Sequence, residues 1–196
     1  MKTRILVASI LVAIGATSAF AQTTATTVQR DINQQTRIEN GLKDGSLSTK
    51  EAGRLEREQS QIDRLQAMDL KDGKLSPQER KQLRQAQNKA NSDIQAARNN
   101  GVTGNPNSKS SERLQADVQR NVNQEKRIEQ GVQSGALTNQ EVAKLEHGQA
   151  KVDHKEAKAA RDGHIEKHEQ AGIQHKEGRQ SEEIFDKKHN ASVRKG

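Results

Sequence analysis

The stretch IENGLKDGSLSTKEAGRLE, residues 38–56, returns 90 positions later as IEQGVQSGALTNQEVAKLE, residues 128–146. Around it, residues 28–100 align with residues 118–190 without a gap, and 22 of the 73 aligned positions are identical. Because gap-free alignment preserves the length of every helix and turn, this similarity predicts an internal duplication.

A shorter pattern, Gly-x-(Leu/Ile)-(Ser/Thr)-x-x-Glu, occurs in both copies and predicts a helix end followed by a helix start. The glycines that would adopt the left-handed backbone at these turns are Gly45, Gly73, Gly135 and Gly163. The expected capping boxes pair Ser48 with Glu51, Ser76 with Glu79 and Thr138 with Glu141. The fourth turn has Glu166 at the cap position, which predicts a weaker helix start.

Between these turns, helix-favouring residues dominate and apolar residues recur every three or four positions. This pattern predicts helices near 28–43, 49–70 and 77–98 in the first copy. We therefore expect an all-α protein of two tandem three-helix units, residues 22–98 and 112–196, the second with a polar C-terminal tail. The segment NNGVTGNPNSKSS, residues 99–111, would be a flexible linker between them.

The first 21 residues have the pattern of a signal peptide. Lys2 and Arg4 precede an apolar run over residues 5–16, and Ala19-Phe20-Ala21 forms a cleavage site. The run is too short to cross a bilayer, which takes about 20 residues, and no later stretch is as apolar. We therefore expect a periplasmic or secreted protein with no transmembrane segment in the mature chain.

Composition narrows the function further. The net charge of +7 falls to +5 without Lys2 and Arg4, and Phe185 is the one aromatic residue after position 21, which argues against nucleic-acid binding. No cysteine is present, so disulfides cannot stabilise the fold. Few large hydrophobic residues and no nucleophile or phosphate-loop motif predict thin cores and no enzymatic activity.

The Asp-Gly turns look like the second half of an EF-hand loop, but their ligand positions do not match calcium binding. If Gly73 is the loop glycine, the first and third ligand positions fall on Met68 and Leu70. The third position is apolar at all four turns. We therefore expect turns that resemble an EF-hand without its calcium ligands.

All six histidines lie in the second copy, which leaves two interpretations open. Their counterparts in the first copy are all polar, which is typical of surface positions. Spacings of four and seven residues also place several of them on shared helix faces, where they could bind zinc, copper or nickel weakly. The candidate metal ligands are His147, His154, His164, His168 and His175. No other cofactor is expected.

The phrases NQQTRIENGLKDGSLSTKEAGRLE, LKDGKLSPQERKQL and RQSEEIFDKKHNA resemble those of a family of small exported helical proteins from Gram-negative bacteria, a family without an assigned activity. The resemblance covers most of both copies, although we associate that family with a single unit. It implies an exported, helical, non-enzymatic protein and transfers no functional residue to this chain.

These observations lead to three functional hypotheses. The first is a structural or protein-interaction role, with an unknown protein partner or through self-association. The alternative is periplasmic binding or buffering of zinc, copper or nickel by the histidine-bearing second copy. A third is chaperone-like protection during envelope stress.

Overall fold

The structure is a computed structural model that describes the backbone of residues 15–191 and the side chains of residues 23–191. Residues 1–14 of the predicted signal peptide lie outside the described residues, as do residues 192–196 of the predicted polar tail.

The described residues are all-helical, as predicted, and contain no strand. The helices are α1 (Gly15–Asp44), α2 (Thr49–Asp69), α3 (Pro77–Arg98), α4 (Lys109–Ser134), α5 (Asn139–Ala159), the 3-10 helix η1 (Ala160–Asp162) and α6 (Lys167–His189). Within this part of the chain, no helix combines the length and hydrophobicity that crossing a bilayer requires.

The predicted turn chemistry is confirmed at the helix boundaries. The side chains of Ser48, Ser76 and Thr138 each accept a hydrogen bond from the backbone N–H of the glutamate three residues later, and that glutamate reaches back to complete the box. The four turn glycines have positive φ angles between 75° and 91°. Local capping hydrogen bonds and glycine turns therefore mark where α2, α3 and α5 begin.

Helix α1 differs from the prediction because it begins at Gly15 instead of near residue 28. Its first described side chains have partners in the second half of the chain. Ala25 is buried in a hydrophobic cluster, and the Thr24 hydroxyl donates to Asn139 Oδ1 at 3.1 Å. These tertiary contacts extend the helix beyond the apolar periodicity that predicted it.

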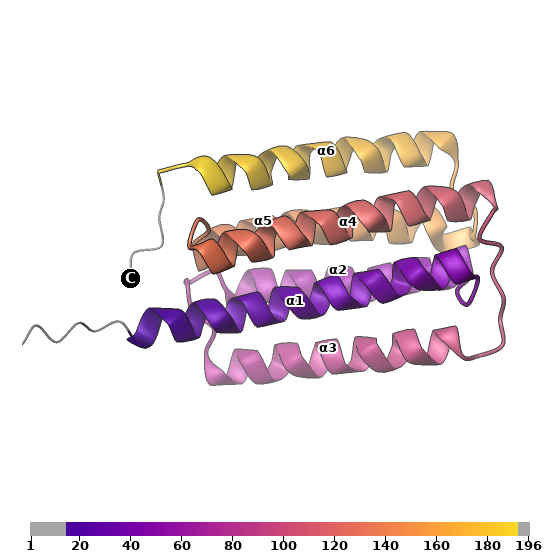
Figure 1. The fold of residues 1–196 in the computed structure, drawn as a ribbon. Coiled ribbons are helices and arrows are strands. Elements are labelled where there is room, and N and C mark those ends of the chain that lie inside the picture. Colours follow the sequence, from indigo (N-terminus) through magenta and orange to yellow (C-terminus); the bar gives the residue numbers. More distant parts are fainter. Residues whose placement is uncertain (1–14, 192–196) are drawn as a thin grey trace, which may run out of the picture.

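Four helices, α1, α2, α4 and α5, form the centre of the bundle (Figure 1). Helix α1 packs against α4 and α2 packs against α5, each pair antiparallel. Helices α3 and α6 lie on opposite sides of this centre: α3 packs on α1 and α2, and α6 packs on α4 and α5. The centre of the molecule is thus built from both halves of the chain.

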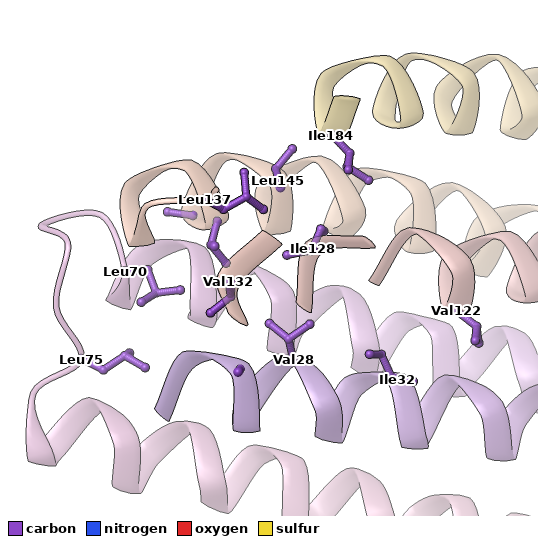
Figure 2. Packing of buried hydrophobic residues seen from close by; sticks show 13 residues of the cluster. Val28, Ile32, Leu70, Leu75, Val122, Ile128, Val132, Leu137, Leu145 and Ile184 are labelled. Carbon is purple, nitrogen blue, oxygen red and sulfur yellow. The ribbon is translucent and has the colours of Figure 1, made fainter. Parts of the chain in front are cut away.

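Two large hydrophobic clusters occupy the two ends of the bundle, and each draws side chains from both halves. Figure 2 shows one of them, where Val28 and Ile32 of α1 lie near Ile128 and Val132 of α4. In the other cluster, Ile38 and Leu42 join Leu114 and Val118. Burial of these side chains holds the two halves together.

The connection between α3 and α4 is held against the first turn. The backbone N–H of Gly104 donates to the Gly45 carbonyl at 2.8 Å, and Arg98 forms an ion pair with Asp44 at 2.6 Å. A side chain at position 104 would come within 2.2 Å of the Leu47 carbonyl oxygen, so this contact requires glycine.

Candidate metal centre

The middle of the bundle, between the two hydrophobic clusters, contains an unusual number of buried carboxyl groups. Seven acidic residues among residues 23–191 are no more than 3% exposed and form no ion pair: Asp31, Glu56, Asp63, Glu125, Glu146, Asp153 and Glu156. Acidic side chains are almost never buried to this degree unless they are paired or bind a cation. This cluster is the most chemically distinctive part of the described structure.

Three of these carboxylates, Glu56, Asp153 and Glu156, form the candidate metal centre. One oxygen from each lies within 4.8 Å of one from each of the others, and all three side chains are buried. Glu56 comes from α2, and the other two lie one turn apart on α5. The antiparallel packing of α2 on α5 therefore brings the three groups together.

Two amide side chains from the other central helices complete the surroundings. Gln35 of α1 donates from Nε2 to Glu56 Oε2 at 3.0 Å and to Asp153 Oδ2 at 3.4 Å. Asn121 of α4 donates from Nδ2 to Asp153 Oδ1 at 3.1 Å and to both Glu156 oxygens at 3.1 and 2.9 Å. All four central helices thus contribute to one group of polar atoms.

Several oxygens of this group have no hydrogen-bond partner among the described residues: Gln35 Oε1, Asn121 Oδ1 and Glu56 Oε1. Gln35 is 3% exposed and Asn121 is completely buried. A buried acceptor without a donor costs free energy on the order of 1–3 kcal/mol. A half-turn of either amide would exchange its N–H₂ for its oxygen toward the carboxylates.

The electrostatic surroundings of the three carboxyl groups also favour a bound cation. Burial raises the pKa of Glu56 to about 8 and raises the pKa of Asp153 and Glu156 well above the usual range. Within residues 23–191, neither lysine nor arginine forms an ion pair with these three groups. Any negative charge on these groups would be stabilised by the amide N–H groups of Gln35 and Asn121, without a neighbouring cationic side chain among the described residues.

Two further sets of buried carboxyl groups adjoin the centre. Asp63 interacts with Asp153, and burial raises the pKa of both carboxyl groups. On the other side, the guanidinium of Arg120 contacts Glu177 at 2.6 Å and Asp117 at 3.5 Å. Burial raises the pKa of Asp117 to about 8 despite this cation.

The five histidines that the sequence singled out do not meet. Each of them is exposed, and the one group of three or more metal-binding side chains among the described residues contains no histidine. His147 and His154 lie on α5, His168 and His175 lie on α6, and His164 lies in the turn between η1 and α6. Their metal binding stays a prediction that the structure does not test.

The Asp-Gly turns have a clear local role. The carboxylates of Asp44, Asp72 and Asp162 each accept the backbone N–H two residues later at 2.9 Å. This contact closes the turn from within, as aspartate commonly does at such positions. The aspartates thus form the turns that the sequence predicts.

Comparisons with known proteins assign neither a family nor a function to the chain. No family model matches the chain, and neither a curated protein nor a solved structure is significantly similar to it.

Sequence reasoning missed the carboxylate cluster, although a signal for it was present. Glu56, Gln59 and Asp63 are spaced as one face of a helix, and their counterparts 90 residues later are Glu146, Gln149 and Asp153. All three are therefore identical in the two copies, whereas surface positions between them differ. Polar residues that repeat unchanged at helical spacing indicate an interior polar face.

Proposed function

We propose that this protein binds a divalent cation that prefers oxygen ligands, Ca²⁺ or Mn²⁺, in the interior of its helical bundle. The observation that supports the proposal most strongly is the convergence of Glu56, Asp153 and Glu156 to within 4.8 Å in full burial. Gln35 and Asn121 would supply amide oxygens as additional ligands.

The ligand atoms favour this class of metal. Every candidate donor is a carboxylate or amide oxygen, whereas zinc and copper sites usually include sulfur or imidazole nitrogen. Mg²⁺ normally keeps several water molecules, which a site with fully buried ligands does not readily accommodate. Ca²⁺ and Mn²⁺ fit these donors better.

The spacing of the oxygens also suits such an ion. Ca²⁺–oxygen distances are about 2.3–2.6 Å, so two ligands on opposite sides of the ion lie about 4.6–5.2 Å apart. The three carboxylate oxygens are already within 4.8 Å of one another. Binding would need only small side-chain shifts and the rotation of two amides.

Such a site would stabilise the folded protein and would not catalyse a reaction. Its ligands are buried, which leaves little room for a substrate beside the metal. Because burial raises the pKa of all three carboxyl groups, metal binding would release protons and strengthen as the pH rises. This is consistent with a non-enzymatic protein.

The wider setting that we propose is an exported protein whose residues 1–21 are removed, and whose halves, residues 22–98 and 112–196, are two copies of one three-helix unit. The gap-free alignment supports the duplication. In the exported location, the bundle would serve a structural or interaction role that the bound cation stabilises.

The test is a thermal melt of residues 22–196, followed by circular dichroism after removal of metals with a chelator. We expect Ca²⁺ or Mn²⁺ to raise the midpoint, because a ligand that binds only the folded state stabilises it by about 2.7 kcal/mol at 100 times its Kd. The variant D153N should lose this response. Isothermal titration calorimetry would give the stoichiometry.

Two controls make the result specific. The exposed-residue variant D162N should respond like the unchanged protein, and so should the triple variant H164A/H168A/H175A. A midpoint that no metal shifts would refute the proposal. A response to Zn²⁺, Cu²⁺ or Ni²⁺ that disappears only in the histidine variant would instead support the transition-metal hypothesis.

A further inference from the structure

The described surface includes a groove between α2 and α5, edged on one side by α6, with a volume of about 850 Å³. Ala67, Met68 and Ala143 form part of its lining. Met68 is 65% exposed, although large hydrophobic side chains are usually buried. The groove thus presents an apolar strip to solvent.

Cationic side chains line this strip from both helices. Arg64 and Lys71 come from α2 and the turn after it, and Lys144 and Lys151 come from α5. Within residues 23–191, none of the four forms an ion pair. The groove has one acidic lining residue, Glu183, so its charge is strongly positive.

The spacing of these cations indicates the shape of a ligand. Lys144 and Lys151 are seven residues apart on α5, which is two helical turns or about 10 Å along the axis, whereas Arg64 lies on α2 and Lys71 lies in the turn that follows it. A helix laid along the groove would present side chains to Lys144 and Lys151 over two of its own turns, with Arg64 and Lys71 on its other side. Its apolar face would cover Met68 and the two alanines.

We infer that this groove docks an acidic amphipathic helix of a partner protein. The helix would place apolar residues on the Met68 strip and Asp or Glu residues opposite the two rows of unpaired cations. The groove has the two features such a ligand requires, namely an apolar floor and charges complementary to its acidic flanks. This inference concerns the surface and is independent of the buried metal centre.

The experiment measures fluorescence anisotropy of a labelled synthetic helix with leucines on one face and glutamates on its flanks. Comparison probes are a scrambled peptide of the same composition and a peptide with lysine in place of glutamate. We expect saturable binding of the acidic helix alone, weakening as salt rises because the charges are solvent-exposed.

Two double variants locate the site. K144E/K151E reverses two groove cations on exposed positions of α5, and K158E/K167E makes the same charge change on exposed positions outside the groove. We expect the Kd of the acidic helix to rise at least about tenfold in the first and to change less than about threefold in the second. Circular dichroism would verify that both variants remain helical.

The inference would be overturned by equal losses in the two double variants, since that result indicates non-specific attraction to the net charge. Equal affinity for the scrambled peptide would also overturn it. Binding to phosphatidylglycerol vesicles without binding to the acidic helix would assign the groove to a lipid surface. Sedimentation velocity without the probe would detect a second copy of the chain as the occupant instead.

Discussion

The hydroxyl of Ser60 donates a hydrogen bond at 2.8 Å to the backbone carbonyl of Ala150, the residue that corresponds to it 90 positions later. Asp63 likewise interacts with Asp153, its own counterpart. Contact between a residue and its own counterpart is typical of the centre of a two-fold symmetric interface. The α2–α5 pair therefore has the geometry of a homodimer interface within one chain.

This relationship predicts that residues 23–98 on their own associate as a dimer. The two large hydrophobic clusters include side chains from both halves, so an isolated half would expose apolar surface that a second copy can cover. We expect a helical dimer by sedimentation equilibrium, with a melting midpoint that rises with concentration. A helical monomer whose midpoint is independent of concentration would contradict the prediction.

A close contact between α2 and η1 supplies a second prediction. A Cβ atom added at Gly53 would lie 2.5 Å from the Cβ of Ala160, so the substitution G53A should force the two elements apart. We expect a loss of about 1–3 kcal/mol in the free energy of unfolding, measured with urea.

Gly178 provides the matched control for G53A. It lies within α6 and has no atom within 4 Å of an added Cβ. Because alanine is the better helix former, G178A should stabilise the protein by up to about 1 kcal/mol. Opposite signs for the two substitutions support the packing explanation, whereas stabilisation by both would show that the α2–η1 contact is loose.

The helix boundaries were predictable because their chemistry is local. A cap such as Ser48 and a glycine such as Gly45 act within a few residues of sequence, so their pattern is visible without knowing the fold. Helices α2 and α3 accordingly match the predicted ranges to within one residue. The contact between Thr24 of α1 and Asn139 was not predictable, because the two residues are 115 positions apart in the sequence.

The candidate metal centre was hidden for the opposite reason. Hydrophobic periodicity gives no reason to place polar residues such as Glu56 and Asp153 in the interior. Their burial follows from the packing of α2 on α5, which brings together residues about 97 positions apart. Only the combination of helical spacing and repetition marked this face, and neither alone distinguishes an interior polar stripe from a solvated one.

The proposed metal centre predicts an unusual effect of the substitution E56Q. Glutamine keeps the shape of the side chain and removes an ionisation that burial opposes, since the pKa of Glu56 is about 8. Without metal we expect E56Q to stabilise the protein at pH 9, on the order of 1–3 kcal/mol, and to change little at pH 5.

Added Ca²⁺ or Mn²⁺ should reverse this order, because the substitution removes a charged ligand. E182Q, at an exposed position of α6, serves as the control and should behave like the unchanged protein at both pH values. Chemical denaturation of E56Q and of the unchanged protein, each with chelator and with metal, measures the free energy of unfolding under these four conditions. If E56Q destabilised the chelated protein at pH 9, the charge of Glu56 would have to be compensated by a contact that the structure does not contain.

The buried carboxyl groups also predict how stability without metal depends on pH. Burial raises the pKa of Asp31 to about 7 and the pKa of Asp117 to about 8, from ordinary values near 4. Between the unfolded and folded values the folded state holds more protons, so a rising pH favours unfolding. The stabilisation is complete below about pH 4 for these two groups and is lost as the pH rises through 7 to 8.

From these two groups we expect the melting midpoint of the chelated protein to fall as the pH rises from about 4 to about 8. Circular dichroism melts at constant ionic strength measure the midpoint at each pH. The double variant D31N/D117N should show a flatter dependence of the midpoint on pH, because the introduced asparagines do not ionise. Ordinary acid-labile proteins show the reverse slope between pH 3 and 6, where salt-bridged carboxylates become protonated. A midpoint that rises from pH 5 to pH 9 would mean that these carboxyl groups are ionised in the folded protein. Their charge would then have to be neutralised by a cation that the chelator does not remove.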